Sequence, residues 1–355
     1  MSEKRVAMTP EQQPCARNIV LTIAGFLIIL AWMRYAQDLI VPFLLALFIA
    51  VIAATPVDWL KRKGVPVPLA VMLVLLVCIA LGFFVTLLLG ASTDQFSQNL
   101  PEYQTRLLEL RNGLFNWFTT RGFNLPESPG ILNVIDPGQA MGFANSLMSS
   151  LGGVFGNAFL IMFTVLFMLL EAWSFPKKIE SIYGSGSATV LARISDVIRS
   201  ARQYLSIKTL MSLATGILVA AGTALIGLDF PVLWGFLAFV LNFIPTIGSI
   251  IAAVPAVLLS LVQLSSTATL GVILVYLTAN IVIGNIVEPR YLGEKVGLST
   301  LVVFISMVFW GWLLGPVGML LSVPLTMTVK FGAMASEESR WLAILLGPGS
   351  ETQGE

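Results

Sequence analysis

The sequence predicts an all-α polytopic membrane protein. Of its 355 residues, 57% are hydrophobic and only 11% are charged, whereas an average soluble domain has about 25% charged residues. Apolar stretches long enough to cross ~30 Å of hydrocarbon as a helix recur along the chain. Because a soluble core of this size could not bury so much apolar surface, we expect the lipid bilayer to be a partner of this chain.

About eight apolar segments should be embedded in the membrane. Two of them are too long for one simple crossing, and each contains proline and glycine near its centre. We interpret both as re-entrant helical hairpins of opposite orientation. A pair of short crossings, or one long kinked helix, stays open as an alternative for each. The full set comprises residues 18–34, 38–54, 66–91, 150–172, 206–227, 231–263, 268–286 and 299–331.

Positive charge predicts the orientation of the chain. Lys61, Arg62 and Lys63 follow the second apolar segment, and further basic residues gather in the N-terminal tail and between residues 173 and 208. Cytoplasmic loops carry an excess of Lys and Arg, so we expect these regions and both termini to be cytoplasmic. The predicted organisation is an N-terminal tail (1–17), three transmembrane helices (18–91), an extracytoplasmic amphipathic region (92–149), a fourth transmembrane helix (150–172), a cytoplasmic basic amphipathic region (173–205), a transport core with two broken hairpins (206–331) and a cytoplasmic tail (332–355).

Composition argues against several function classes. The chain has no histidine, which is the commonest metal ligand and a frequent general base. Its two cysteines, Cys15 and Cys78, stand in the N-terminal tail and in an apolar segment, so neither suggests a disulfide or a metal site. A net charge of +1 gives no reason to expect a nucleic-acid partner, and no Gly-x-x-x-x-Gly-Lys-[Ser/Thr] phosphate loop is present. We therefore expect no enzyme, no cofactor and no metal.

The first broken segment offers the strongest candidates for substrate binding. Pro245 and Gly248 should break the helix and free backbone groups, which a membrane tolerates only inside protein or beside water. Asn242, Thr246 and Ser249 stand around this break. Their side chains could bind a hydroxylated ligand, or they could only cap the broken helix ends, and both interpretations stay open.

The second broken segment has a related sequence. GPVGMLLSVP (315–324) resembles PTIGSIIAAVP (245–255), since each has a proline before a glycine, then small or aliphatic residues and another proline. Gly315, Pro316 and Gly318 carry no polar side chain, so they would contribute backbone atoms and close approach to a substrate. Opposed broken elements that meet near the middle of the bilayer are a recurring transporter design, although the similarity could also be chance.

Polar residues also interrupt the segment TANIVIGNIVEPR. We expect Asn280 and Asn285 to face the bundle interior and to contribute to substrate binding, because unpaired amides in lipid are costly. Glu288 could be a coupling carboxylate, could form a gate with Arg290, or could be part of a structural ion pair. Glu171 ends the fourth apolar segment, where it could carry protons if deeply placed or could simply be solvated.

Three long motifs then resemble one known family. They are FVLNFIPTIGSIIAAVP, GNIVEPRYLG and GLSTLVVFISMVFWGWLLGPVGMLLSVPLT, and the likeness extends over nearly the whole chain. The sequence is similar to the autoinducer-2 exporter family of bacterial membrane proteins. This resemblance implies export of the quorum-sensing signal autoinducer-2, a small polar molecule, across the bacterial inner membrane by a secondary or facilitative mechanism. It also implies a homo-oligomer, such as a pentamer.

Two other functions stay open at this point. A sodium/proton antiporter of the same family would need an essential acid within the membrane, for which Glu171 and Glu288 are the candidates. A non-transporting membrane scaffold is the further alternative. The broken and polar-lined segments argue against a scaffold.

Overall fold

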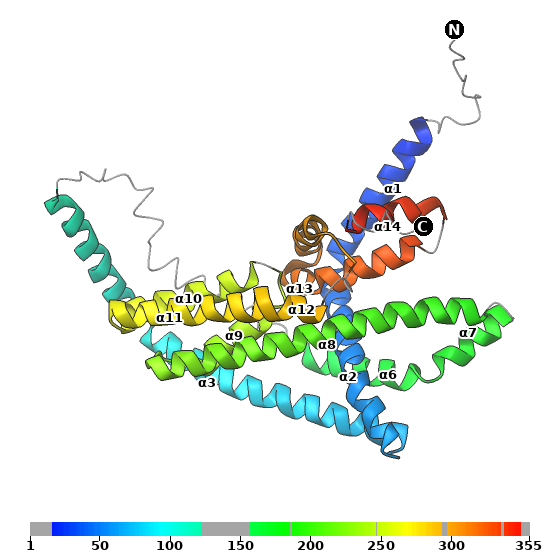
Figure 1. Ribbon diagram of the computed structural model, residues 1–355, viewed down its shortest axis with the longest axis horizontal. Coiled ribbons are helices and arrows are strands. Elements are labelled where there is room, and N and C mark those ends of the chain that lie inside the picture. The colour runs from blue at the N-terminus through cyan, green and yellow to red at the C-terminus, as the bar shows by residue number, and fades with distance from the viewer. Residues whose placement is uncertain are drawn as a thin grey trace, which may run out of the picture.

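The computed structural model describes residues 16–121, 157–184, 187–245, 247–292, 297–334 and 337–348. Every regular element in these ranges is a helix (Figure 1), so the predicted all-α class is confirmed. The first elements are α1 (Ala16–Tyr35), α2 (Gln37–Arg62), α3 (Val67–Thr120), α6 (Ala158–Glu171) and α7 (Phe175–Tyr183). They are followed by α8 (Ser187–Ile226), α9 (Pro231–Leu241), α10 (Gly248–Gln263), α11 (Ser266–Thr278), the π-helix η3 (Ala279–Val287), α12 (Glu288–Leu292), α13 (Thr300–Met334), the short 3-10 helix η5 (Glu337–Ser339) and α14 (Arg340–Leu346).

Within the described ranges, five helices are long and apolar enough to cross a membrane, and a sixth span results if the bent pair α6–α7 counts as one. The expectation of about eight apolar segments is therefore not confirmed. One reason is length, because the two arms of the first broken segment, Pro231–Leu241 and Gly248–Gln263, are each shorter than the roughly 17 residues that a crossing needs. By length and composition the five candidates are Gln37–Arg62, Val67–Leu87, Val190–Ile226, Ser266–Tyr291 and Thr300–Met334, the last of which is broken at Gly315.

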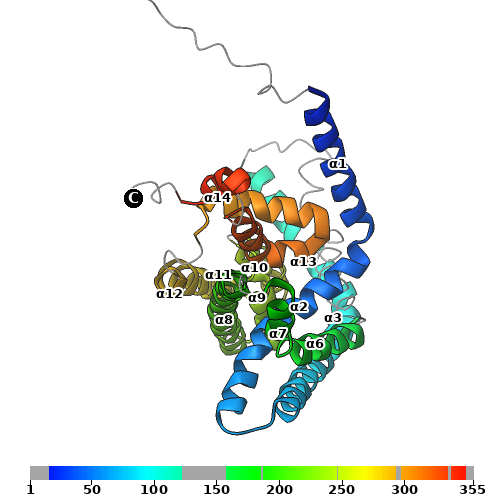
Figure 2. The same cartoon turned by 90° about the vertical axis from the view of Figure 1, so that its right-hand side faces the viewer.

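Helices α1 and α2 follow one another almost without interruption. Ala36 N donates to Trp32 O (2.8 Å) and Ile40 N donates to Ala36 O (3.0 Å), so helical hydrogen bonding continues across the join. The chain bends there, and α2 then crosses the direction of α8 and α11 (Figure 1, Figure 2).

Helix α3 continues well beyond its apolar part. The sequence becomes polar after residue 91, where we expected the third transmembrane helix to end, but the helix runs on through Pro101 to Thr120. Pro101 removes one helical hydrogen bond, and Thr105 Oγ1 donates to the Pro101 carbonyl (3.0 Å). We call residues 88–120 the α3 arm, and its far end projects away from the other helices in Figure 1.

Small residues bring α8 and α9 into close contact. A Cβ on Gly235 would lie 2.6 Å from Ala220 Cβ and 2.6 Å from Gly216 O, so the two helices meet here with no room for a side chain on Gly235. Close packing of this kind holds helices together in membranes, where lipid tails remove the hydrophobic driving force. This contact fixes α9 against the long helix α8.

The first broken segment reverses direction after α9 and returns as α10. At its open end, Asp229 N donates to Gln263 Oε1 (3.0 Å), although the two residues are 34 positions apart. Gln263 Nε2 in turn donates to Gly227 O (3.3 Å). We call residues 231–263 the first hairpin, residues 242–248 its tip, and the end at Asp229 and Gln263 its base.

Helix α13 also folds back on itself, at Gly315. This glycine has φ 69° and ψ −156°, a conformation that only glycine adopts readily. Trp310 Nε1 donates to Thr326 Oγ1 (3.0 Å), 16 positions along, whereas in one straight helix the two residues would be about 24 Å apart. At the open end, Lys330 Nζ donates to the Gly297 carbonyl (2.5 Å). We call α13 the second hairpin.

Candidate functional site

The tip of the first hairpin is held by α8. Asn242 follows the last residue of α9, and its Nδ2 donates to Ser212 Oγ (3.0 Å). Ser212 is completely buried. On the same face of α8, the buried hydroxyls of Thr215 and Thr223 donate to carbonyls of their own helix. The tip contact therefore places one amide and one hydroxyl inside the bundle.

The other side of the tip contacts the π-helix η3. Ser249 Oγ donates to Asn280 Oδ1 (3.2 Å), and both side chains are partly buried. Asn280 stands near the middle of the 26-residue apolar span Ser266–Tyr291, so this polar contact lies at mid-depth of that span. Asn285 lies on the exposed surface of the same π-helix. Of the two asparagines expected to face the interior, only Asn280 therefore lies beside the hairpin tip.

Glycine at position 248 lets the two arms of the first hairpin meet. A Cβ there would lie 1.8 Å from Leu241 O, so any other residue would force the backbone to shift. Pro245 is half-buried in the turn, and Thr246 lies outside the described residues. The sequence between Leu241 and Gly248 therefore marks the reversal of the chain.

The break in the second hairpin uses glycine in the same way. A Cβ on Gly318 would lie 2.0 Å from Trp310 O, which parallels the tight contact at the first tip. Gly318 is buried, whereas the neighbouring Pro316 is exposed. Gly315 has open space around it, so its positive φ angle is what requires glycine.

The two tips reach neighbouring parts of α8. Val317, next to the second break, packs in one apolar cluster with Tyr204 of α8, and Asn242 of the first tip bonds Ser212. Tyr204 and Ser212 are separated by about 12 Å along a helix. The opposed tips that face each other stay a prediction, and the observed contacts place both broken segments beside α8.

A buried ion pair lies between those two contacts. Lys208 Nζ donates to Glu288 Oε1 (2.6 Å), and the two side chains are only 7% and 13% exposed. Glu288 directly follows η3, a π-helix of nine residues. Such π-helical turns are rare in proteins, and those that occur are often found at functional sites. Arg290, which we considered as the gate partner of Glu288, is exposed. The ion-pair partner of Glu288 is Lys208.

Glu171 ends α6 at an exposed position. Its carboxylate pairs with Lys178 of α7, and both side chains are more than half exposed. An exposed pair of this kind adds little to stability, because water screens both charges. Among the described residues, no group of three Cys, Asp or Glu side chains could hold a metal ion.

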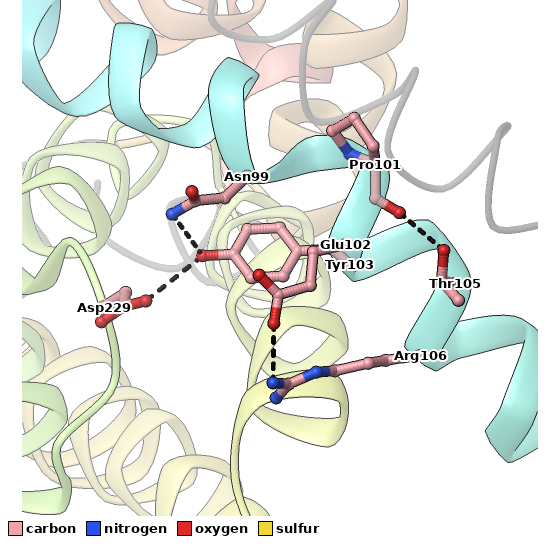
Figure 3. A network of polar contacts seen from close by, with 7 residues as sticks. All are labelled: Asn99, Pro101, Glu102, Tyr103, Thr105, Arg106 and Asp229. Atoms are coloured by element: carbon pink, nitrogen blue, oxygen red, sulfur yellow. Dashed lines mark hydrogen bonds and ion pairs between the residues drawn. The ribbon is translucent and has the colours of Figure 1, made fainter.

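The base of the first hairpin carries a second polar network (Figure 3). Tyr103 Oη of the α3 arm donates to Asp229 Oδ2 (3.2 Å) and accepts from Asn99 Nδ2 (3.4 Å). Trp234 Nε1 donates to the Asp229 carbonyl (2.7 Å). Tyr103 is 5% exposed, and burial raises the pKa of its phenol above the usual range. The arm is therefore docked on the hairpin base.

Several residues of these networks were not predicted as site residues from the sequence: Lys208 and Ser212 on α8, and Tyr103, Asn99, Asp229 and Trp234 at the hairpin base. From the sequence, Lys208 belongs to the basic region that we placed in the cytoplasm. A usable signal does exist, because polar residues at 208, 212, 215 and 223 repeat on one face of an otherwise apolar helix. No local signal pairs Tyr103 with Asp229, since the two are 126 positions apart.

A model of AI-2E family transporters matches residues 19–333 of this chain. The chain belongs to the AI-2E transporter family. It is 39% identical over 329 residues to the AI-2 transport protein TqsA of Escherichia coli K12, and the alignment covers 93% of this chain and 95% of TqsA. It is 38% identical over 343 residues to the putative transport protein YhhT of the same organism, with coverage of 96% and 97%. A putative transport protein of Haemophilus influenzae is 37% identical over 334 residues, with coverage of 92% and 95%.

Membership of the AI-2E family fixes the general class of this protein. The family and these relatives are transport proteins and not enzymes. Together with the apolar helices, this makes the chain a multi-pass membrane transporter. The first hairpin, all but the last residue of the second, the Ser249–Asn280 contact and the Lys208–Glu288 pair lie within the residues that the family model matches.

Proposed function

We propose that this AI-2E family member exports autoinducer-2 across the bacterial inner membrane by a secondary or facilitative mechanism. The observation that carries the proposal is its 39% identity to the AI-2 transport protein TqsA over nearly the full length of both chains. A phosphate loop for ATP is absent from the sequence, so release down a gradient or coupling to an ion gradient would drive the export.

The geometry supports a small polar substrate. Asn242 and Ser212 on one side of the first tip, and Ser249 and Asn280 on the other, offer hydrogen-bond donors and acceptors, and Asn280 stands near the middle of the apolar span Ser266–Tyr291. A hydroxyl-rich molecule needs such partners when it leaves water, because an unpaired polar group in an apolar setting is costly. We propose that these four side chains exchange their mutual hydrogen bonds for bonds to the substrate.

The remaining candidates have supporting roles in this proposal. Pro245, Gly248, Gly315, Pro316 and Gly318 shape the two tips, and Thr246 would add a hydroxyl to the first. Asn285 would face a neighbouring subunit rather than the substrate, because it is exposed on a single chain. This fits the homo-oligomer, such as a pentamer, that we propose for the protein in the membrane.

We propose that the hairpins are re-entrant and enter from opposite faces, with both termini in the cytoplasm. Single cysteines introduced by Thr246→Cys and by Pro316→Cys test the arrangement, with the native cysteines replaced. A membrane-impermeant thiol reagent should reach the first only from outside the cell and the second only from the cytoplasm. Labelling of both from the same face would contradict the opposite orientation.

Proteoliposomes test the substrate directly. Purified protein should accelerate the flux of labelled autoinducer-2 over that of liposomes without protein, and the pH and sodium gradients should be set separately. A dependence on one gradient would identify the coupling ion. If no gradient and no concentration difference drives protein-dependent flux of autoinducer-2, the export proposal is wrong.

A second candidate function is sodium/proton antiport, which the buried carboxylate of Glu288 favours. Antiport requires an acid that can exchange a proton and a cation within the membrane. At least one of the variants Glu288→Gln and Glu171→Gln should then abolish sodium-driven proton movement in proteoliposomes, and Glu288→Gln is the expected one because Glu171 is exposed. If both variants retain full activity, exchange through either acid is excluded.

A further inference from the structure

Lys208 and Glu288 form the most buried ion pair in the described part of the chain. Their side chains are 7% and 13% exposed, whereas the next pair, Arg202–Asp58, is 34% and 32% exposed. Both lie in helices that are long and apolar enough to span a membrane. Ionisable residues in such places are costly, and they usually mark a transport path.

The position of Lys208 on α8 links the pair to both hairpins. Four residues earlier, Tyr204 belongs to the same buried apolar cluster as Val317, which lies beside the break of the second hairpin. Four residues later, Ser212 accepts a hydrogen bond from Asn242 at the tip of the first hairpin. Residues four apart in a helix share one face, so the ion pair occupies the turn of α8 between the two tip contacts.

Glu288 is attached to an element that could change its register. The π-helix η3 precedes it directly and ends where α12 begins. A π-helical turn holds more residues than an α-helical turn. If one turn of η3 relaxed to α geometry, the register of Glu288 would shift by one residue, which rotates it by about 100° around the helix axis. This rotation would separate the carboxylate from Lys208.

We propose that the Lys208–Glu288 pair is a gate of the transport path, which must open for the substrate to pass between the two hairpin contacts. When closed, the pair seals the first tip and its polar side chains from one face of the membrane. When open, it gives a passing hydroxylated molecule an ammonium donor and a carboxylate acceptor. The gate does not depend on autoinducer-2 being the substrate, because it rests on contacts within the chain.

Accessibility of a buried reporter tests the gate without any substrate. Ser212 is 0% exposed and lies one turn from Lys208 on the sealed side. Ser212→Cys is introduced after replacement of the native Cys15 and Cys78, and an impermeant thiol reagent is added to either face of sealed vesicles. The neutral double variant Lys208→Met/Glu288→Gln should fold, because replacing both members of a buried pair avoids an unpaired charge.

If the pair is a gate, the reagent should label the Ser212→Cys reporter from one face of the membrane. The labelling rate should be at least fivefold higher in the neutral double variant than with the native pair. The reversed pair Lys208→Glu/Glu288→Lys should restore slow labelling. Thr223→Cys is the matched control, since Thr223 is also 0% exposed but lies eleven residues further along the same face of α8.

Two results would overturn the gate. The first is equal labelling of Ser212→Cys with the native and the neutral pair, which would make the pair a static support. The second is faster labelling of both Ser212→Cys and Thr223→Cys, which would mean that the helices have loosened generally. Neither result bears on autoinducer-2 flux, so failure of the gate and failure of the proposed substrate are separate findings.

Discussion

At the scale of single residues, two glycines decide whether the hairpins can form. Gly248 and Gly318 each lie where the second arm of a hairpin begins. Gly248 faces the backbone carbonyl of Leu241 in the first arm, and Gly318 faces that of Trp310. A methyl group at either position would lie 1.8 Å or 2.0 Å from that carbonyl oxygen. Such distances cannot be relieved by a rotamer change, because both partners are backbone atoms.

We therefore predict that Gly248→Ala and Gly318→Ala each destabilise the protein by about 3 kcal/mol or more, at or beyond the upper end of overpacking costs. Thermal unfolding in detergent would measure the loss. Gly332→Ala is the matched control in the same helix as Gly318, since nothing lies within 4 Å of its Cβ position. Equal stability of Gly248→Ala and Gly332→Ala would contradict the close approach.

The two asparagines of η3 allow a second prediction at this scale. If the Ser249–Asn280 contact is part of the binding site, Asn280→Ala should reduce autoinducer-2 flux by roughly 5- to 150-fold, which corresponds to the loss of about 1–3 kcal/mol of hydrogen bonding. Asn285→Ala should reduce flux much less, because Asn285 is exposed. Equal losses for the two variants in proteoliposomes would argue against this division of roles.

At the scale of elements, the broken segments illustrate what a sequence can and cannot predict. Proline and glycine near Pro245 and Gly315 mark the reversals, because their backbone preferences act locally. The pairing of the arms is less visible, since Gln263 reaches Asp229 and Trp310 reaches Thr326 across many residues. The π-helical form of η3 was not predicted, because no composition or spacing rule identifies it.

Gln263 is expected to hold the base of the first hairpin closed. Its amide accepts from Asp229 N and donates to Gly227 O, so Gln263→Leu would leave two backbone groups without these bonds. We predict a loss of about 1–3 kcal/mol in the free energy of unfolding, measured by denaturant titration. Gln203→Leu on the exposed surface of α8 is the control and should change it by less than about 0.5 kcal/mol.

At the scale of the whole molecule, the long helices α8 and α3 connect parts that are distant in sequence. Helix α8 bonds the first tip through Ser212, shares an apolar cluster with Val317 of the second hairpin and carries Lys208, so the candidate path depends on one continuous element. The sequence suggested the tips and Glu288 but not Lys208, because the partner of a buried charge is set by tertiary packing. The α3 arm connects the polar region after residue 91 to the base of the first hairpin through Tyr103 and Asp229.

The docking of the α3 arm leads to a prediction with a pH dependence. Tyr103→Phe removes only the hydroxyl that bonds Asp229, so hydrogen exchange of arm amides near residue 103 should rise about tenfold, as expected for ~1.4 kcal/mol. Glu102→Gln is the control, because the Glu102–Arg106 pair is exposed and should matter little. Similar exchange in both variants would mean that the hydroxyl does not hold the arm.

The raised pKa of Tyr103 sets the direction of the pH effect. The folded state keeps the phenol proton to a higher pH than the unfolded state, whose tyrosine pKa is about 10. The stabilisation by the docked phenol is therefore complete below about pH 10 and falls as the pH rises through the folded pKa. Exchange of the arm in the native protein should rise above about pH 10 beyond the intrinsic increase. In Tyr103→Phe this additional rise should be absent, because no phenol remains at this position to lose its proton.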